Sequence, residues 1–187
     1  MTWSTRPSSK PIANGRPVRS DTEERPGAAM AIEIERKFLL IDDSWRPLAV
    51  RRDWLRDGLL AVTANRKVRV RIYGDRATLT IKARTGGIRN AEYEYEIPVA
   101  DAEELLARHC DGNLLTTTRH YVPYKGFMWE IDVYEGLLAG VVLAEVEIPR
   151  ENTDVPLPPW VGAEVTGKPE YKKINLQKAR LAARASP

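Results

Sequence analysis

A strict alternation of charged and apolar residues runs through most of this chain and limits the folds open to it. Residues 32–37 read IEIERK, so Glu33, Glu35 and Lys37 alternate with Ile32, Ile34 and Arg36. A period of two is that of a β-strand, in which successive side chains point to opposite faces. The three charges therefore share one face of a predicted strand.

The same alternation recurs along the chain. Its charged or polar faces are Arg69/Arg71, Thr80/Lys82, Glu92/Glu94/Glu96, Thr117/Arg119, Glu130/Asp132 and Glu145/Glu147. An ordinary antiparallel sheet places such a face in water. A sheet that closes into a barrel instead turns these faces into a lumen, and helices or a partner cover its apolar outside. Solvent faces usually mix in Ser, Thr, Gln and Asn, so the repeated Glu and Arg favour the barrel.

The remaining segments predict an α+β protein that is mainly β. Residues 67–84 and 114–136 are typical of hairpins, the second turned at Pro123 to Gly126. Helical spacing predicts a short helix in 42–60 that Gly58 would end, and another in 101–112 with Asp101 as N-cap. A third helix is expected in 171–184. Six to eight mostly antiparallel strands with two or three helices indicate a barrel or a sandwich.

Composition predicts one folded domain behind a tail. Of 187 residues, 43% are hydrophobic, which is enough for a core. Residues 1–29 are rich in Pro, Ser, Gly and Arg and predict a disordered tail, which leaves 30–187 as the domain and Met30 as an alternative start. The single cysteine, Cys110, excludes an internal disulfide and a thiolate metal site, so we expect it to pack in the core.

The charge balance and the hydropathy of the chain limit the kinds of partner that it can bind. Basic and acidic residues are nearly balanced, 29 against 26, so composition does not support a nucleic-acid partner. No apolar run of about 18 residues predicts a membrane span, and the start lacks the apolar middle of a signal peptide. We therefore expect a cytoplasmic protein with no membrane partner.

The charged faces suggest a chemistry. Carboxylates without His or Cys companions suit Mg²⁺ or Mn²⁺ rather than zinc. Guanidinium and ammonium groups suit phosphate oxygens. A lumen that holds both must compensate its own charges, because unpaired buried ions are very unfavourable. The combination is typical of a site for a metal-chelated polyphosphate.

At this point the chain resembles a known family. EIERKFLL resembles the Glu-x-Glu-x-Lys signature of the CYTH, or triphosphate tunnel metalloenzyme, superfamily, in its short bacterial form. Matching motifs follow in family order over about residues 30 to 180: VRVRI, LTIK, EYEYEIP, TRHYV, WEIDVYEG, LAEVEIP and VTGKPEYKKINL. The resemblance implies a closed eight-stranded antiparallel β-barrel that forms a tunnel, with a few flanking helices.

The resemblance also implies roles for residues of this chain. The metal would be bound by Glu33, Glu35, Glu145 and Glu147, and the triphosphate would be bound, and its reaction catalysed, by Lys37, Arg69, Arg71, Lys82 and Arg119. Glu94 and Asp132 would complete a second metal shell or orient water. Family members often read Lys-Thr-Arg where this chain has Thr117-Thr118-Arg119. Either Lys172 or Lys173 substitutes for that lysine, or activity and substrate preference differ.

The resemblance implies an enzyme that hydrolyses a small triphosphate with Mg²⁺ or Mn²⁺, with inorganic tripolyphosphate as first candidate. Water would attack a terminal phosphorus while the metal and the arginines stabilise charge. A class IV adenylyl cyclase and a thiamine triphosphatase are alternatives. A non-catalytic polyphosphate-binding module is another, motivated by the missing lysine. The oligomeric state stays open, a homodimer included.

Overall fold

The computed structural model describes residues 12–13, 16–17, 32–110 and 114–185. Most of the predicted tail, and Met30, lie outside these ranges, so the prediction of disorder stays a prediction. Within the tail, β1 (Ile12–Ala13) pairs antiparallel with β2 (Arg16–Pro17). Over the described ranges, we find no helix with the length and apolar character needed to cross a membrane.

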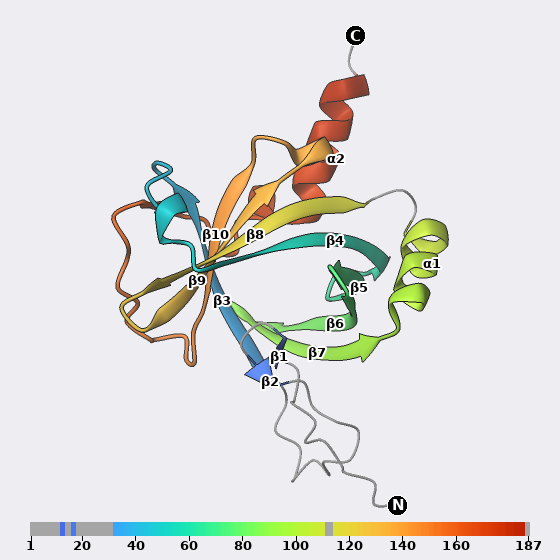
Figure 1. Cartoon of the computed structure of the whole chain (residues 1–187), viewed down its shortest axis with the longest axis horizontal. Helices are drawn as coiled ribbons and strands as arrows, with labels where there is room; N and C mark the ends of the chain where they lie inside the picture. The colour runs from blue at the N-terminus through green and yellow to red at the C-terminus, as the bar shows by residue number, and fades with distance from the viewer. Residues whose placement is uncertain (1–11, 14–15, 18–31, 111–113, 186–187) are drawn as a thin grey trace, which may run out of the picture.

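Eight antiparallel strands close into a barrel (Figure 1). They are β3 (Ile32–Leu40), β4 (Arg51–Val62), β5 (Arg66–Tyr73), β6 (Arg76–Gly86), β7 (Arg89–Ile97), β8 (Leu115–Tyr124), β9 (Phe127–Tyr134) and β10 (Val142–Glu147). The order around the barrel is β10-β9-β8-β4-β5-β6-β7-β3, and pairing of β3 with β10 closes it. A further strand, β11 (Val161–Glu164), extends β3. The predicted closed eight-stranded barrel is confirmed.

Two α-helices flank the barrel, α1 (Val99–His109) and α2 (Lys173–Ala185). Short 3-10 turns are η1 (Arg46–Leu48), η2 (Gly136–Leu138) and η3 (Pro169–Tyr171). Both helices were predicted, but the N-cap at Asp101 is wrong. Pro98 is the N-cap residue and makes no side-chain cap bond. Asp101 instead lies in the first turn, where a carboxylate favours the helix dipole.

The helix predicted in 42–60 is wrong, because most of this segment is strand β4. β4 pairs with β5 on one edge and with β8 on the other, and this tertiary pairing overrides the local spacing. Gly58 therefore ends no helix. It lets α1 approach the strand, since a Cβ on Gly58 would lie 2.7 Å from the Cys110 sulfur.

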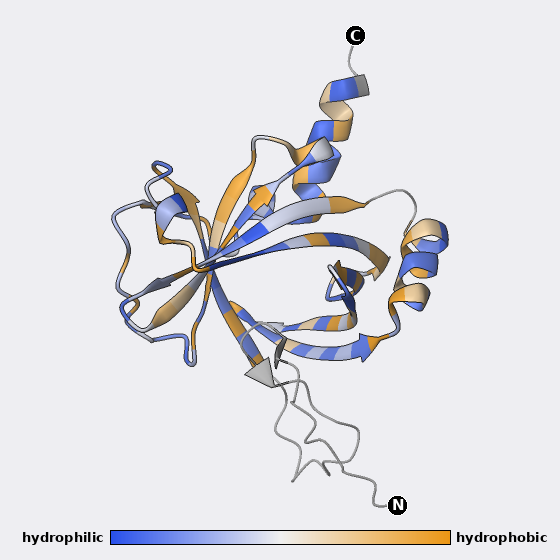
Figure 2. Ribbon diagram, in the orientation of Figure 1, coloured by the Kyte–Doolittle hydropathy of each residue, from blue (hydrophilic) through white to orange (hydrophobic). Residues whose placement is uncertain are grey.

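Hydrophobic and hydrophilic residues alternate along several strands in Figure 2, and apolar side chains form buried clusters against the barrel. α1 packs its Ala102 and Leu106, with Cys110, on the β5 residues Val70 and Ile72. The buried Cys110 is a free thiol, as expected for a packing residue. A second apolar cluster joins Phe38, Trp129 and Val146 to Trp45 and Trp160 from connecting segments. The opposite faces of the strands are left to point inward.

Candidate active site in the barrel lumen

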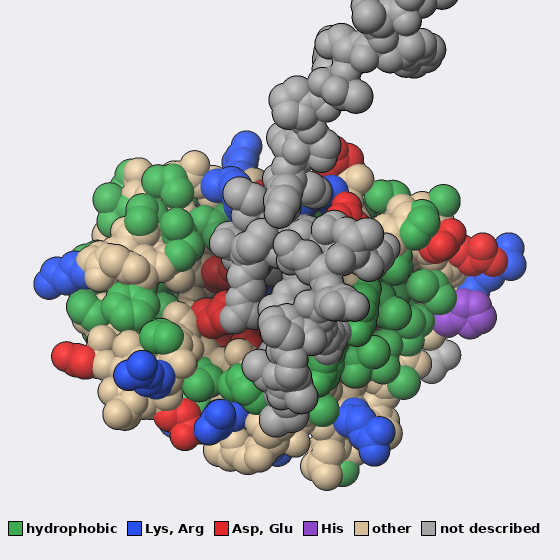
Figure 3. All heavy atoms as spheres, turned by 90° about the horizontal axis from the view of Figure 1, so that it is seen from below, with side chains coloured by type: hydrophobic (Ala, Val, Ile, Leu, Met, Phe, Trp, Pro, Cys, Tyr) green, Lys and Arg blue, Asp and Glu red, His purple; other side chains and the backbone are tan. Residues whose placement is uncertain are grey.

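The inward faces of all eight barrel strands line one cavity of about 1220 Å³. Charged residues from β3, β5, β6, β7 and β10 form much of its wall, and the start of α2 contributes Lys173. Figure 3 shows Asp and Glu side chains (red) within a hollow bordered by apolar and neutral surface. The volume is above the usual range for small-molecule sites, so a polyphosphate and its ions have room. The charged faces thus converge on a lumen, as the barrel interpretation predicted.

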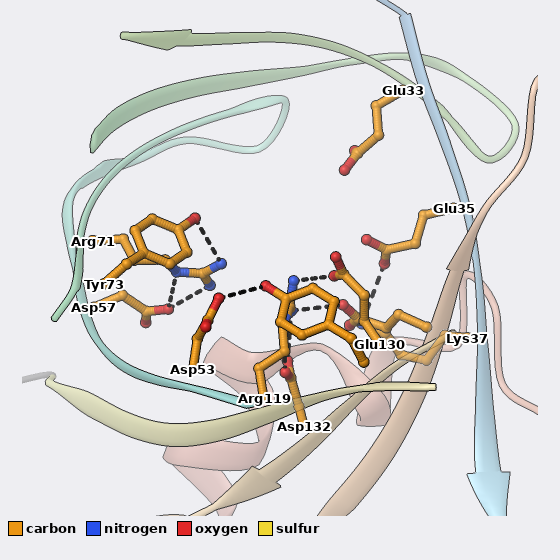
Figure 4. A network of polar contacts seen from close by, with 12 residues as sticks. Glu33, Glu35, Lys37, Asp53, Asp57, Arg71, Tyr73, Arg119, Glu130 and Asp132 are labelled. Carbon is orange, nitrogen blue, oxygen red and sulfur yellow. Dashed lines mark hydrogen bonds and ion pairs between the residues drawn. The ribbon is translucent and has the colours of Figure 1, made fainter. Parts of the chain in front are cut away.

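Two buried arginine–aspartate pairs form part of the polar network in Figure 4, and we call them the inner arginine pairs. Arg71 donates from Nε and Nη2 to Asp57 Oδ2, at 3.0 and 2.6 Å. Arg119 binds both oxygens of Asp132, with Nε–Oδ1 2.7 Å and Nη2–Oδ2 2.8 Å. All four side chains are at most 8% exposed. Each guanidinium is therefore held by a carboxylate that water barely reaches.

Strand register creates these pairs. Asp57 lies directly opposite Arg71 across β4 and β5, and Arg119 lies directly opposite Asp132 across β8 and β9. Side chains that face each other in this way lie within contact distance. Burial alone would lower the pKa of Arg119, but Asp132 and Glu130 outweigh it and raise that pKa. Both members of the pair are therefore charged.

Arg119 also connects its own pair to the neighbouring strands. It contacts Glu130, and its Nη2 lies 3.3 Å from Glu145 Oε2. The other oxygen of Glu145 lies 2.8 Å from Lys37 Nζ, which also lies 3.7 Å from Glu35. Burial raises the pKa of Glu145, but Lys37 and Lys173 outweigh it, so the pKa is lowered overall. An uninterrupted run of opposite charges thus joins β8, β9, β10 and β3.

A second group of charges is less buried, and we call it the outer cluster: Glu33, Glu35, Lys67, Lys82 and Glu92. Lys82 contacts Glu33 and lies 2.9 Å from Glu92, and these three side chains are 13–18% exposed. Burial raises the pKa of Glu33, and the charges of Glu35 and Glu92 raise it further. Three carboxylates, Glu33, Glu35 and Glu92, therefore crowd around the ammonium group of Lys82.

This crowding bears on the predicted metal. Glu33 and Glu35 project into the same space in Figure 4, and Glu147 lies opposite Glu35 in the β3–β10 register. Their oxygens are the donors that Mg²⁺ and Mn²⁺ prefer. Burial raises the pKa of Glu33 most, and a divalent cation would relieve the repulsion from Glu35 that adds to this. Among the described residues, no three Asp, Glu, His or Cys side chains already surround a common point. The oxygen donors of the site fit a hard cation, and the carboxylates would have to move closer together to bind one.

The structure brings nearly all predicted site residues to the cavity wall. Those on the wall are Glu33, Glu35, Lys37, Arg69, Arg71, Lys82, Glu94, Arg119, Glu145, Glu147 and Lys172. Glu94 accepts a hydrogen bond from Thr80 and lies 3.8 Å from Arg69. Asp132 is the exception. It is fully buried behind Arg119, where Lys173 also contacts it at 3.1 Å.

Other residues of the site had no role in the sequence interpretation. Asp57 fell in the segment interpreted as a helix, where charged and apolar residues do not alternate and gave no signal of a strand. Glu92 and Glu130 were placed on charged faces but given no function. Lys67 lies two residues before Arg69, on the same face, so its spacing was the available signal. Of the two candidate lysines near α2, Lys173 contacts Asp132, whereas Lys172 is exposed.

Comparison with known proteins agrees with this architecture. The chain is 40% identical over 149 residues to an inorganic triphosphatase of Acetivibrio thermocellus, a match that covers 80% of this chain and 95% of the relative. It is 33% identical over 151 residues to an inorganic triphosphatase of Nitrosomonas europaea, covering 77% and 95%. A crystal structure of an inorganic triphosphatase matches with a TM-score of 0.55 at 33% identity, over 78% of this chain and 93% of that one.

The family model for the CYTH domain matches residues 31–184, which include every strand of the barrel and nearly all of α2. The match begins next to the Glu33/Glu35/Lys37 strand and extends past the lysines at the start of α2. With relatives above 30% identity over most of its length, the chain belongs to the CYTH domain family.

Proposed function

We propose that this chain hydrolyses inorganic tripolyphosphate in the barrel lumen, with Mg²⁺ or Mn²⁺. The observation that supports this most directly is the wall of basic side chains in one cavity, supplied by four strands: Lys37, Arg69, Arg71, Lys82 and Arg119. Such groups bind phosphate oxygens, arginine in bidentate fashion. The two bacterial relatives named inorganic triphosphatases point to the same substrate.

The inner arginine pairs would position these groups before substrate arrives. Asp57 holds Arg71 and Asp132 holds Arg119, so neither guanidinium needs to reorganise much when it meets a phosphate. Fixed donors of this kind stabilise charge that develops during reaction. Because Asp132 lies behind Arg119, we propose it as a positioning residue and not as a metal ligand.

The metal would be held by Glu33, Glu35 and Glu147, with Glu145 as a fourth ligand whose oxygens now face Lys37 and Arg119. When bound, such a cation neutralises phosphate charge and polarises a phosphoryl oxygen. Glu94 would orient Arg69 or a water. Lys172 and Lys173 would bind substrate at the α2 end of the lumen.

In the proposed reaction, water attacks a terminal phosphorus, and the bond from that phosphorus to the bridging oxygen breaks. Phosphate and pyrophosphate leave as products. The basic wall would hold the oxygens of both parts while the bond breaks. We place this activity in the cytoplasm and propose no nucleic-acid or membrane partner.

Assays on three substrates with Mg²⁺ or Mn²⁺ test the proposal. Tripolyphosphate, ATP and thiamine triphosphate are compared by phosphate release, and ATP also by pyrophosphate release. We expect tripolyphosphate to be the fastest. Pyrophosphate release with cyclic nucleotide would indicate a cyclase, and binding without turnover would indicate a non-catalytic module. Lys82→Met should abolish most turnover, whereas Lys125→Met, in the exposed turn between β8 and β9, should not.

A further inference from the structure

Lys67 differs from the five basic side chains that we propose to bind substrate, Lys37, Arg69, Arg71, Lys82 and Arg119, because each of those forms an ion pair with a carboxylate. Lys67 lies on β5 with its side chain on the cavity wall, on the same face as Arg69 and directly opposite Lys82 of β6. Its neighbours are paired: Lys82 lies 2.9 Å from Glu92, and Arg69 lies 3.8 Å from Glu94. Over residues 32–110 and 114–185, no carboxylate forms an ion pair with Lys67.

The surroundings of Lys67 disfavour its positive charge. Burial lowers its pKa, and the charges of Lys82 and Arg69 lower it further, to about 7. Glu35 on β3 acts in the opposite direction, and Lys173 of α2 adds to the lowering. Near neutral pH this lysine is therefore partly unprotonated in the protein without a ligand.

A polyanion in the lumen would reverse this balance. Phosphate oxygens bound to Arg69 and Lys82 would lie beside Lys67, because the strand pairing places Lys67 opposite Lys82 and two residues from Arg69 on the same face. Negative charge at that distance favours the ammonium form, which then donates hydrogen bonds to the phosphates. Binding of the anion and uptake of a proton would be linked.

We propose that Lys67 is a further substrate-binding residue, which takes up a proton when a polyphosphate binds and then contacts its oxygens. The proposal rests on the proposed function, because it takes a polyphosphate as the occupant of the lumen. It adds a specificity device: the site gains one positive charge only when a highly charged anion enters. Glu33, whose pKa is also raised by burial, is present in wild type and in Lys67 variants alike, so a difference in proton uptake between them belongs to Lys67.

Calorimetric titration with tripolyphosphate and Mg²⁺ at pH 8, in two buffers with different heats of ionisation, measures the protons taken up. Wild type, Lys67→Met and Lys67→Arg are compared, so the ligand's own protons cancel. We expect wild type to take up as much as one proton more than either variant. Lys67→Met should bind about 10-fold more weakly, as expected for losing a hydrogen bond to a charged group, and Lys67→Arg should bind about as well as wild type.

Lys125→Met serves as the control for replacing a lysine, since that side chain is exposed in the β8–β9 turn. Circular dichroism of each variant checks that it is folded. If all variants bind with the wild-type proton uptake, Lys67 has no such role although the proposed function stands. If wild type and Lys125→Met bind no tripolyphosphate, the proposed function fails and the role of Lys67 fails with it.

Discussion

The inner arginine pairs and the outer cluster line the same lumen but compensate their charges in different ways. Each inner arginine has a carboxylate directly opposite and is at most 5% exposed. In the outer cluster, Lys82 serves two carboxylates, Glu33 is crowded by Glu35 and Glu92, and Lys67 has no carboxylate. The inner arginines are thus neutralised by the protein itself. The outer cluster contains crowded carboxylates and also a lysine without a carboxylate partner among the described residues.

This difference separates two tasks. Buried charges require a partner, and an inner pair keeps its partner whether or not a ligand is present. An inner pair therefore contributes to the stability of the fold and to the position of its arginine. A group of the outer cluster becomes fully compensated when an anion or a cation binds, so it contributes to the selection of the ligand. Removing an inner carboxylate should therefore mainly lower stability, and changing an outer group should mainly alter binding or turnover.

The largest effect is expected at an inner pair. Asp132→Ala leaves Arg119 and Lys173 without their shared carboxylate in a site with no exposure. Breaking a buried pair by removing one partner costs about 3 to 5 kcal/mol of unfolding free energy. Denaturant unfolding of wild type and variant measures this. Asp43→Ala is the control, because its pair with Arg46 is exposed and should contribute at most about 1 kcal/mol. Equal losses in both variants would contradict the description of Asp132 as a buried counter-ion.

A smaller free-energy change, seen in turnover, is expected for a carboxylate of the outer cluster. Glu35→Gln keeps the shape of the side chain and removes its charge, so the metal dependence should weaken. Turnover of tripolyphosphate should fall at least about 100-fold, the usual effect of losing one key stabilising group. Glu104→Gln, on the exposed face of α1, is the control.

The stability of the fold should change much less in Glu35→Gln than in Asp132→Ala. Glu35→Gln should unfold at nearly the wild-type denaturant concentration, since it removes one of several crowded carboxylates. If this variant keeps its turnover and loses stability, Glu35 belongs with the inner pairs, and the separation of tasks is wrong.

The two lysines near the start of α2 test where substrate reaches. Lys173 is half-buried and lies 3.1 Å from Asp132, whereas Lys172 is exposed on the rim of the cavity. Lys173→Met should weaken tripolyphosphate binding by about 1.5 to 3 kcal/mol, the range for a hydrogen bond to a charged group. Lys172→Met is the matched variant and should change affinity less. A larger loss of affinity in Lys172→Met would mean that Lys172, and not Lys173, takes the place of the lysine missing at position 117.

The sequence was sufficient for most of the fold, because a period of two identifies the face of each strand without knowledge of its neighbours. It failed at β4, where Leu48, Val50 and Trp54 have helical spacing. Hydrogen bonding to β5 and β8 on both edges, which no local pattern reveals, decides in favour of the strand. The predicted face of Arg71 was right, but its partner Asp57 depends on the register between two strands.

The sequence also could not predict how deeply each charged side chain is buried in the lumen. Asp132 and Glu130 share one face of β9 and look alike in the alternation, yet one is fully buried and the other lies on the cavity wall. Their difference arises from how far along the barrel each residue lies and from Arg119, which covers Asp132. Periodicity gives the direction of a side chain and not the distance from solvent.

The smallest effect is a change of stability with pH that belongs to Lys67 alone. Its pKa is about 7 in the folded protein and near 10.5, the ordinary value for a lysine, in the unfolded chain. Between these values the unfolded chain binds a proton that the folded protein does not, so stability rises with pH in this window. Below about pH 7 both states hold the proton, and above about 10.5 neither does.

Denaturant unfolding at pH 7, 8, 9 and 10 isolates this contribution when Lys67→Met is subtracted from wild type, because all other groups cancel. The difference should rise in favour of wild type by about 1 kcal/mol, since partial exposure screens the charge. Lys67→Arg cannot lose its proton in this range, so subtracting it should give the same slope. Flat differences for both variants would mean that Lys67 stays charged and compensated in the empty lumen. The outer cluster would then resemble the inner arginine pairs, and the contrast between the two regions would no longer hold.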